Sequence, residues 1–482
     1  MRLSSRQKGI ALLVFVSIMA TAAAAATVKA LNHSSQNHQI ARDKITASAL
    51  AQAKEALIGY AMTYGDKHQG EVHGYLPCPD ASGTALGGEG AAEGICGAKD
   101  ISAIGRLPWK TLDLMPLRGG DNECLWYAVS GSYKYNPKTG LMNWDTNGQL
   151  QVYASDGTTL LTPADNQAVA VIFAPGTIAS GQDRSGTAAP QCGGNYTPSN
   201  YLDVISTFNN ANVSDTAGAN SAFRIGDASI NSSDRIIFIT KQDLWNAMKR
   251  RQDLLAKLDD MTLKTAKCIA NFGRYNQTGS PPTPNLANKS LPWPAQLPLS
   301  DYTDNTRYND ADEQLVGRVP YRVNTARNTT RNTLFPVSDT DYYLLKSSGQ
   351  SCSSDADWVN TYPWWANWKD HLFYAVSERY KPDHDTTMAC TSGHCVSVNG
   401  TGLYAAVVIF AGDRLTSQLR NDKSVISAYL EGRNASNISE SHSGHGNYQA
   451  ETITLPSTTF NDIVYCIKED LSVVRGNAAG CP

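Results

Sequence analysis

The sequence lacks a strong excess of charge of either sign. Its 482 residues include 41 lysines and arginines and 44 aspartates and glutamates, which gives a formal net charge of -3 at pH 7. A nearly balanced chain has no long-range attraction for polyanions. We therefore expect neither nucleic acid nor an acidic lipid surface as a partner.

The sequence also lacks the short motifs that accompany many catalytic sites. It contains no Gly-x-Ser-x-Gly nucleophile elbow, no His-Glu-x-x-His zinc motif, no phosphate-binding loop and no dinucleotide fingerprint. These absences predict a protein that is not an enzyme and that has no cofactor. A hydrolase stays open as an alternative, because a fold can assemble a triad or a carboxylate pair from distant residues.

Long apolar runs are absent except at the start of the chain. Residues 1–9 are polar and basic, whereas residues 10–27 are apolar and rich in alanine. At about 1.5 Å per residue this run covers about 26 Å, which is close to the thickness of a hydrocarbon core. The pattern predicts a transmembrane helix at 10–27. Alternatives are an uncleaved anchor and a secretory signal that is cut after the alanines at 24–26.

The junction between the basic start and the apolar run carries a family resemblance. The motif Arg-Gln-Lys-Gly at residues 6–9 resembles the site that prepilin peptidase cuts in type IV pilins and type II secretion pseudopilins. The resemblance implies that residues 1–9 are a leader and that the cut falls between Gly9 and Ile10. Major pilins carry a glutamate where this chain has Val14. That departure is similar to minor pilins and pseudopilins placed at a filament tip.

The resemblance implies a non-enzymatic minor, tip-type pilin or pseudopilin that acts in the assembly or surface interactions of a type IV pilus or a type II secretion pseudopilus. Its partners would be other pilin or pseudopilin subunits, prepilin peptidase and the inner membrane. Its body would lie in the periplasm and reach the cell surface after filament assembly. The alternatives are a secreted or membrane-anchored protein that binds a glycan or protein through an aromatic surface, and a periplasmic hydrolase.

The rest of the chain contains an internal duplication, recognised by short blocks that recur in the same order. The blocks include 105–110 with 317–322, 125–130 with 372–377, 171–174 with 408–411, and 241–244 with 468–471. The duplication predicts a first pilin-like repeat at 28–250 and a second at 251–482.

Each repeat is expected to be a helix packed on an antiparallel sheet. Apolar residues recur at helical spacing over 28–64 and 254–272. Short β-branched and aromatic segments predict strands, at 125–130, 150–154, 168–174 and 235–240, and at 372–377, 395–398, 405–411 and 463–467. The predicted fold class is α+β, with an N-terminal transmembrane helix that continues into the first of two tandem pilin-like heads.

All ten cysteines follow the apolar run, and an even number in an exported body indicates disulfides. Cysteines that are jointly absent from the other repeat are paired first, because a bridge is gained or lost as a unit. This argument predicts the pairs Cys78–Cys96, Cys390–Cys395 and Cys268–Cys466. The cysteines that remain give Cys124–Cys192 and Cys352–Cys481.

Two groups of residues are candidates for metal ions, although the prediction is that no metal is bound. A zinc site drawn from Cys390, His394, Cys395, His371 and His384 lacks a second close pair of ligands with zinc-like spacing. Calcium candidates are the acidic loops with Asp145, Asn147, Asp310 and Asp312. Aspartate and asparagine are also common turn formers, so these loops have an equally simple structural explanation.

The most distinctive local feature of the second repeat is a cluster of aromatic residues. It consists of Tyr362, Trp364, Trp365 and Trp368. Flat, exposed rings suit stacking on sugars or anchoring a protein partner. The alternative is that they fill a small core beneath the insertion at 320–374.

Overall fold

The structure is a computed structural model. It describes residues 37–482 except 206, 228–231, 276–288, 312, 325–340, 347–351, 353–356, 383, 386, 440–444 and 453–458.

The predicted membrane helix is a point of correction. No helix within the described ranges is both long and apolar enough to cross a membrane. The described residues therefore form an α+β fold without a membrane helix, which corrects the predicted fold class, and the predicted location in the inner membrane is not retained. The leader at 1–9, Gly9, Ile10, Val14 and the segment 10–27 lie outside the described residues.

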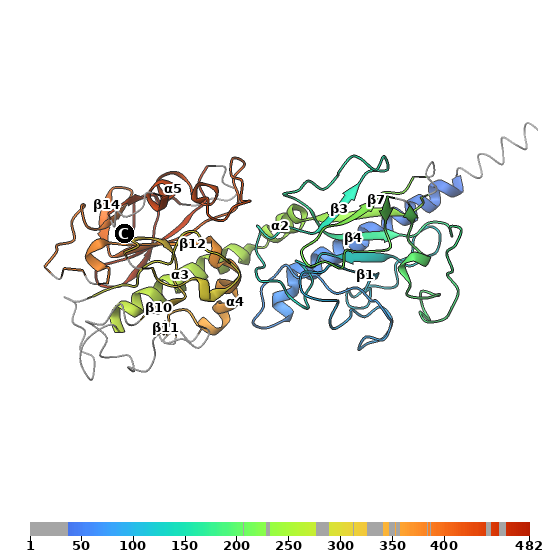
Figure 1. The fold of residues 1–482 in the computed structure, drawn as a ribbon, viewed down its shortest axis with the longest axis horizontal. Helices are drawn as coiled ribbons and strands as arrows, with labels where there is room; N and C mark the ends of the chain where they lie inside the picture. Colours follow the sequence, from blue (N-terminus) through green and yellow to red (C-terminus); the bar gives the residue numbers. More distant parts are fainter. Residues whose placement is uncertain are drawn as a thin grey trace, which may run out of the picture.

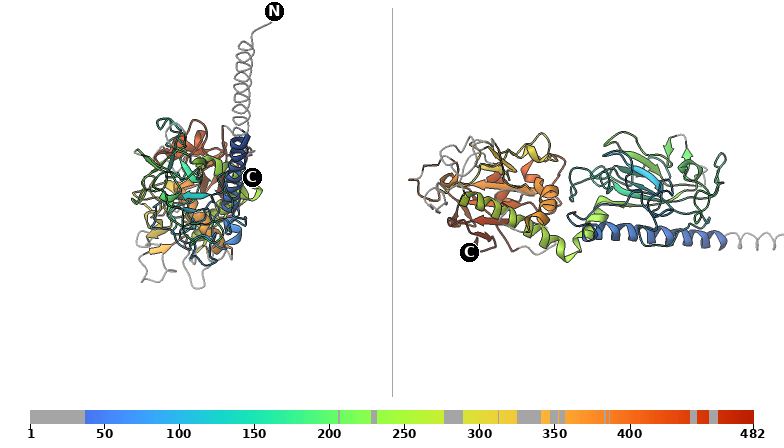
Figure 2. Two further views of the ribbon diagram at one scale, coloured as in Figure 1. Left: turned by 90° about the vertical axis from the view of Figure 1, so that its right-hand side faces the viewer. Right: turned by 90° about the horizontal axis from the view of Figure 1, so that it is seen from below.

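The first described element is a helix over residues 37–67, called here the N-terminal helix. Ala53, Leu57 and Ala61 are fully buried and four residues apart, so they form one apolar stripe. On a neighbouring face, Lys54 Nζ donates to the carbonyl of Phe238 at 3.0 Å. The helix therefore lies along the first sheet, on one side of the molecule (Figure 2).

The first sheet has six strands in the order β1-β2-β4-β3-β7, with β8 also paired to β4. They are β1 (Ala103–Arg106), β2 (Trp126–Val129), β3 (Leu150–Tyr153), β4 (Ala168–Ala174), β7 (Ser221–Arg224) and β8 (Arg235–Thr240). The prediction of an antiparallel sheet is wrong for one pair, because β3 and β7 run parallel. A small hairpin joins β5 (Val204–Ile205) to β6 (Phe208–Asn209).

The second sheet is antiparallel throughout, in the order β18-β17-β15-β12-β9. Its strands are β9 (Val316–Arg318), β12 (Leu372–Val376), β15 (Ala406–Phe410), β17 (Ile463–Ile467) and β18 (Val473–Arg475). Two smaller sheets hold β10 (Arg322–Asn324) with β11 (Asp341–Tyr343), and β14 (Thr401–Tyr404) with β13 (Val396–Val398) and β16 (Asn447–Tyr448).

Four further α-helices connect or cover these sheets. They are α2 (Lys241–Lys249), α3 (Gln252–Tyr275), α4 (Trp358–Trp368) and α5 (Gly432–Ser439). Short 3-10 helices are η1 (Pro198–Asn200), η4 (Asn305–Arg307), η6 (Lys369–His371), η7 (Glu378–Tyr380) and η8 (Ile426–Ala428). Helix α3 packs on β15, β17 and β18 in the second half, as the N-terminal helix packs on the first sheet.

The two halves share a core of four strands. In the first half β1, β2, β4 and β8 are successive neighbours, and in the second half β9, β12, β15 and β17 follow in the same order, all antiparallel. We call the described residues of 37–249 the first head and those of 252–482 the second head. The heads lie end to end, and the first described turns of the N-terminal helix lie at the end remote from the second head (Figure 1).

Candidate functional site

The aromatic helix α4 lies at the seam between the two heads. Trp368 is 1% exposed, and its ring lies 4.5 Å from that of Trp144 and 5.8 Å from that of Trp245, both in the first head. The Trp144 and Trp245 contacts are edge-on, a favourable geometry for aromatic pairs. Trp368 of the second head therefore packs against two tryptophans of the first head and stabilises the contact between the heads.

The other members of the aromatic cluster are also withdrawn from solvent. Trp365 is fully buried and stacks on Tyr321 at 5.4 Å, and Trp364 is 8% exposed and lies edge-on to His73 of the first head. Tyr362 is half-buried. Of the two interpretations of this cluster, burial in a core is confirmed and an exposed binding surface is wrong, because these rings fill the seam and the core beside it.

A buried ionic network crosses the same seam. His371 is fully buried, with Nδ1 3.0 Å from Asp370 Oδ1 and Nε2 3.0 Å from Asp145 Oδ2 of the first head. The indole Nε1 of Trp144 also lies 2.8 Å from Nε2. A protonated ring donates to both carboxylates, whereas a neutral ring with its proton on Nδ1 accepts from Trp144. In either state His371 is bonded to the first head.

Two cations complete this network and fix the charge of its carboxylates. Arg420 lies 3.4 Å from Asp145, and Lys423 is paired with Asp370. Burial raises the pKa of Asp145, but Arg420 and His371 outweigh it, so the pKa lies below its usual value. An ionised, fully paired network of this kind holds two surfaces in one register.

The calcium candidates are not assembled into a site. Asp145 belongs to the ionic network, and Asn147 bonds the backbone of Ala164 at 2.6 Å and of Gln167 at 3.1 Å. Asp310 is buried, and Asp312 lies outside the described residues. The loop at 145–147 therefore serves turn and seam structure.

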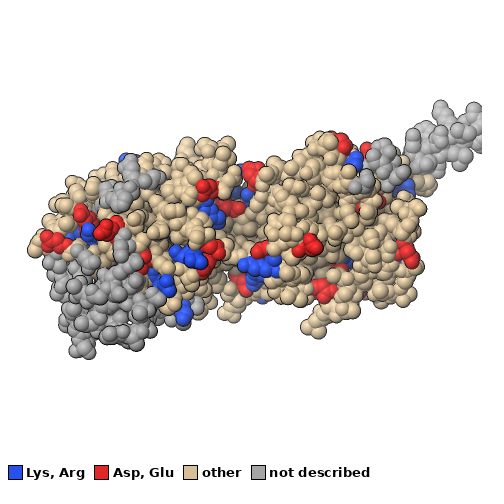
Figure 3. Space-filling view, viewed as in Figure 1, with Lys and Arg blue, Asp and Glu red and all other residues tan. Residues whose placement is uncertain are grey.

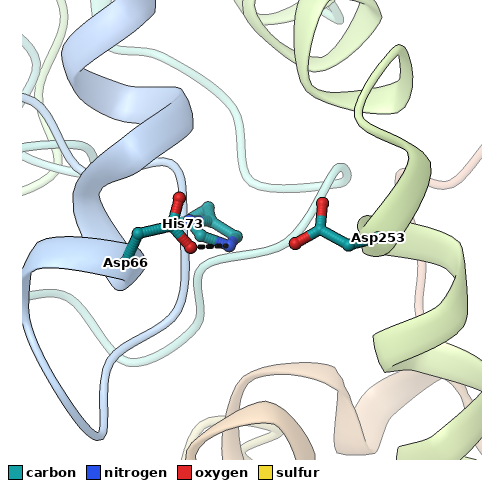
Figure 4. Close-up of side chains that lie close together, drawn as sticks. All are labelled: Asp66, His73 and Asp253. Atoms are coloured by element: carbon teal, nitrogen blue, oxygen red, sulfur yellow. Dashed lines mark ion pairs between the residues drawn. The ribbon is translucent and has the colours of Figure 1, made fainter.

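One cluster at the seam has the ligand types of a metal site and was missed by the sequence analysis. Asp66 ends the N-terminal helix, Asp253 begins α3, and His73 lies between them, with one ligand atom from each within 4.8 Å of the others (Figure 4). No motif could have revealed it, because the three residues come from both sides of the repeat boundary.

Cations already occupy the carboxylates of this cluster. Arg251 donates to Asp66 at 2.7 Å and to Asp253 at 2.9 Å, and Lys257 lies 3.4 Å from Asp253. Burial and these two cations lower the pKa of His73 to about 4. Two cations balance two carboxylates around a neutral imidazole, so we interpret the cluster as an ion-pair clasp between the heads.

The zinc alternative fails because its thiols are not free. Cys390 and Cys395 form a disulfide, and His394 Nδ1 bonds Glu378 at 2.8 Å. His371 belongs to the buried network, and His384 Nδ1 bonds the carbonyl of Lys381 at 2.9 Å. The candidate ligands are therefore committed elsewhere.

All ten cysteines are paired, in five disulfides. Three predicted pairs are confirmed, namely Cys78–Cys96, Cys124–Cys192 and Cys390–Cys395. The other two are wrong, since the structure joins Cys268 to Cys352 and Cys466 to Cys481. Five disulfides are consistent with an extracellular protein.

Strand geometry explains the wrong pairs. Side chains on β17 alternate between the two faces of the sheet. Tyr465 and Ile467 contact the core on the α3 side, whereas Cys466 lies in the core on the opposite face with Cys481. Cys268 on α3 consequently cannot reach Cys466.

The first described turns of the N-terminal helix are exposed, and no other described residue covers them. Residues 37–45 are exposed, and among them Ile40 and Ile45 are 65% and 53% exposed. A groove of about 510 Å³ lies beside them, lined by Arg42 and Thr46 of the helix and by Ser180 and Arg235 of the first head, among others. Ile40 and Ile45 are five residues apart and so lie about 140° apart around the helix, which puts exposed apolar surface on two sides of an otherwise polar segment.

Comparisons of the chain with protein-family models, curated proteins and solved structures found no match.

Proposed function

We propose that the protein is a non-enzymatic subunit of the minor pilin or pseudopilin type that occupies one end of an extracellular filament. The observation that carries the proposal is the exposure of the first described turns of the N-terminal helix, residues 37–45, at the end of the first head remote from the second head (Figure 2). Other pilin or pseudopilin subunits, and prepilin peptidase for processing, are the proposed partners.

Two isoleucines support packing of this helix against other subunits. Ile40 and Ile45 expose apolar surface on a helix whose later turns are buried against the sheet. Burying such side chains contributes roughly 25 cal/mol for each Å² removed from water. Arg42 and Asp43 beside them are paired with Asp121 at 3.1 Å and with Arg235 at 3.7 Å, so they fix this part of the helix on the first head.

The second head supports a position at the filament end. It lies beyond the first head, on the side opposite the first described turns of the N-terminal helix (Figure 1). A subunit stacked above the first head would need the space that the second head fills. The seam of tryptophans and ion pairs keeps the second head there, so it does not swing aside to admit another subunit.

The experiment compares two single substitutions of exposed isoleucines in the full chain. Ile45→Lys places a charge on the exposed helix start, and Ile95→Lys does the same at a site that is 63% exposed and does not line the groove beside that helix. Purified filaments should contain at least tenfold less of the Ile45→Lys protein and normal amounts of the Ile95→Lys protein.

Folding is checked by circular dichroism and by the disulfide map of both variants. Normal incorporation of a folded Ile45→Lys protein would contradict the proposed role of the exposed helix start. Absence of the unsubstituted chain from every filament preparation would contradict the proposed function itself.

A further inference from the structure

Two adjoining cavities lie between the heads. Their volumes are about 680 Å³ and 440 Å³, and both are lined by Trp144, Asn246, Lys249, Asp413 and Arg414. Because they share these five residues, we treat them as one space and call it the inter-head cleft. Charged side chains gather along the seam between the heads, whereas much of the remaining face is uncharged (Figure 3).

The larger cavity supplies an apolar wall. Its apolar lining comes from α3 and from the second sheet with its adjoining loop, and includes Leu255, Phe410, Leu415 and Ile463 beside the ring of Trp144. A wall of this kind favours a ring or an acyl chain, because water leaves apolar surface on both partners.

The smaller cavity is cationic. Lys241, Lys249, Arg414, Arg420 and Lys423 line it. The carboxylates that line it are already paired, through Lys249–Asp413 at 2.5 Å, Arg414–Asp165 at 3.1 Å and Arg420–Asp145 at 3.4 Å. Lys423 is paired with Asp370. The lining therefore has one cation more than these pairs use.

The extra cation is Lys241, the first residue of α2. Within the described parts of the chain, its ammonium group has no hydrogen bond or ion pair, although it is half-buried. Burial lowers its pKa, and Asp145 only partly opposes this effect. An anion in the smaller cavity would restore the stabilisation that the ammonium group loses through burial.

Backbone groups near Lys241 do not compete for that anion. The amide of Lys241 donates to the carbonyl of Gln167 at 3.0 Å, and the amide of Gln242 donates to Asn166 at 2.8 Å. Recognition consequently falls to side chains, and the ammonium group of Lys241 is the free one.

We propose that the inter-head cleft binds an amphipathic organic anion, with its acyl or aromatic body against the apolar wall and its single anionic headgroup at Lys241. Each of the two cavities has a volume in the range of known ligand pockets. This site does not depend on the filament role, and it would give the second head a binding function of its own.

The test titrates the full chain with decanoate, decanol and acetate and follows binding by calorimetry. Decanoate carries both the chain and the charge, decanol only the chain, and acetate only the charge. We expect decanoate to bind at least tenfold more tightly than either of the others. No binding of decanoate, or equal binding of decanoate and decanol, would overturn the proposal.

Substitution of Lys241 tests whether its ammonium group contacts the anionic headgroup. Lys241→Met should weaken decanoate binding about tenfold and leave decanol binding unchanged. Lys44→Met, which removes an exposed lysine of the N-terminal helix, is the matched control and should bind normally. Unaltered decanoate binding by a folded Lys241→Met protein would contradict the assignment, and the three-ligand comparison stands if that variant does not fold.

Discussion

Each head buries an arginine side chain in the first strand of its four-stranded core. Arg106 in β1 and Arg318 in β9 are at most 1% exposed, and each faces a buried tyrosine, Tyr201 at 4.9 Å and Tyr429 at 5.9 Å. Both guanidinium groups donate to backbone carbonyls, for example from Arg106 to Asn195 at 2.7 Å. Because each head has this arrangement, it belongs to the shared fold.

Each head also buries a pair of acidic residues. Asp203 and Asp234 lie together in the first head, as Glu431 and Asp462 do in the second. In both pairs the second residue accepts a hydrogen bond from an asparagine side chain at 3.0 Å. Groups held in duplicate are explained by folding, whereas the exposed helix start and α4 have no such counterpart. Lys241 matches Lys468 in the sequence repeat, but Lys468 donates to the carbonyl of Pro482 at 2.8 Å, so the two lysines differ in what they bond among the described residues. The unshared features are where we place function.

The largest expected effect tests whether the buried arginine stabilises each head to the same extent. Arg106→Ala and Arg318→Ala each leave buried carbonyls without donors and open a cavity, so each should lower the free energy of unfolding by about 5 kcal/mol. Chemical denaturation measures this loss, and Arg433→Ala, at an exposed residue, should cost less than about 1 kcal/mol. A large effect in one head alone would show that the heads use their arginines differently.

The next effect tests the seam. Trp368→Ala removes a buried ring that contacts Trp144 and Trp245, and should lower the free energy of unfolding by about 4 kcal/mol. Without this contact the heads should unfold in two steps rather than one. A single denaturation transition at the original midpoint would argue against the seam as the coupling element.

The third effect is a pH dependence that the acidic pairs predict. Burial and Asp203 raise the pKa of Asp234 to about 7 from an ordinary value of 3.8. The folded state thus keeps a proton that the unfolded state releases, so this contribution to stability is complete below pH 3.8 and is lost as the pH rises through 7. The loss is about 3 kcal/mol, after allowing for relaxation of the buried site.

Asp234→Asn isolates that contribution. The variant should have a flatter profile of unfolding free energy between pH 4 and pH 7, as should Asp462→Asn in the second head, where burial and Glu431 also raise the pKa. Identical profiles for the variants and the unsubstituted chain would mean that neither pair shares a proton.

The smallest expected effect is at the ion-pair clasp between the heads, formed by Asp66, Asp253 and Arg251. Arg251→Met removes the cation between Asp66 and Asp253, whose side chains are about half exposed. Solvent screens such pairs, so the loss should be about 1 kcal/mol and should diminish at high salt. Zinc should not raise the melting temperature of the unsubstituted chain. A rise with zinc would favour a metal site at Asp66, His73 and Asp253.

The sequence predicted the repeated core well because strands there are short, β-branched and matched in order. The segments 168–174 and 235–240 coincide with β4 and β8. Joint absence identified the partners in Cys78–Cys96 and Cys390–Cys395, and Cys124–Cys192 followed from the cysteines that remained. Joint absence failed for Cys268 and Cys466, because it carries no information about which face of a strand a side chain occupies.

The seam was beyond sequence reasoning for a different reason. Pro363 lies inside α4, and a proline argues against a helix when only the sequence is known. The tryptophans of α4 are compatible with either an exposed binding surface or a buried core, so the sequence did not decide between the two. The clasp and the buried network join residues of different heads, and the relative placement of the heads is not encoded in any local pattern. The candidate functional features were therefore found only in the assembled structure.

The most direct test of the account is the position of this chain in purified filaments, measured by gold labelling of the second head and electron microscopy. If the protein occupies one end of the filament, gold label lies at one end of each filament, and the protein is far less abundant than the principal subunit. Label along the whole length, or none on any filament, would contradict it.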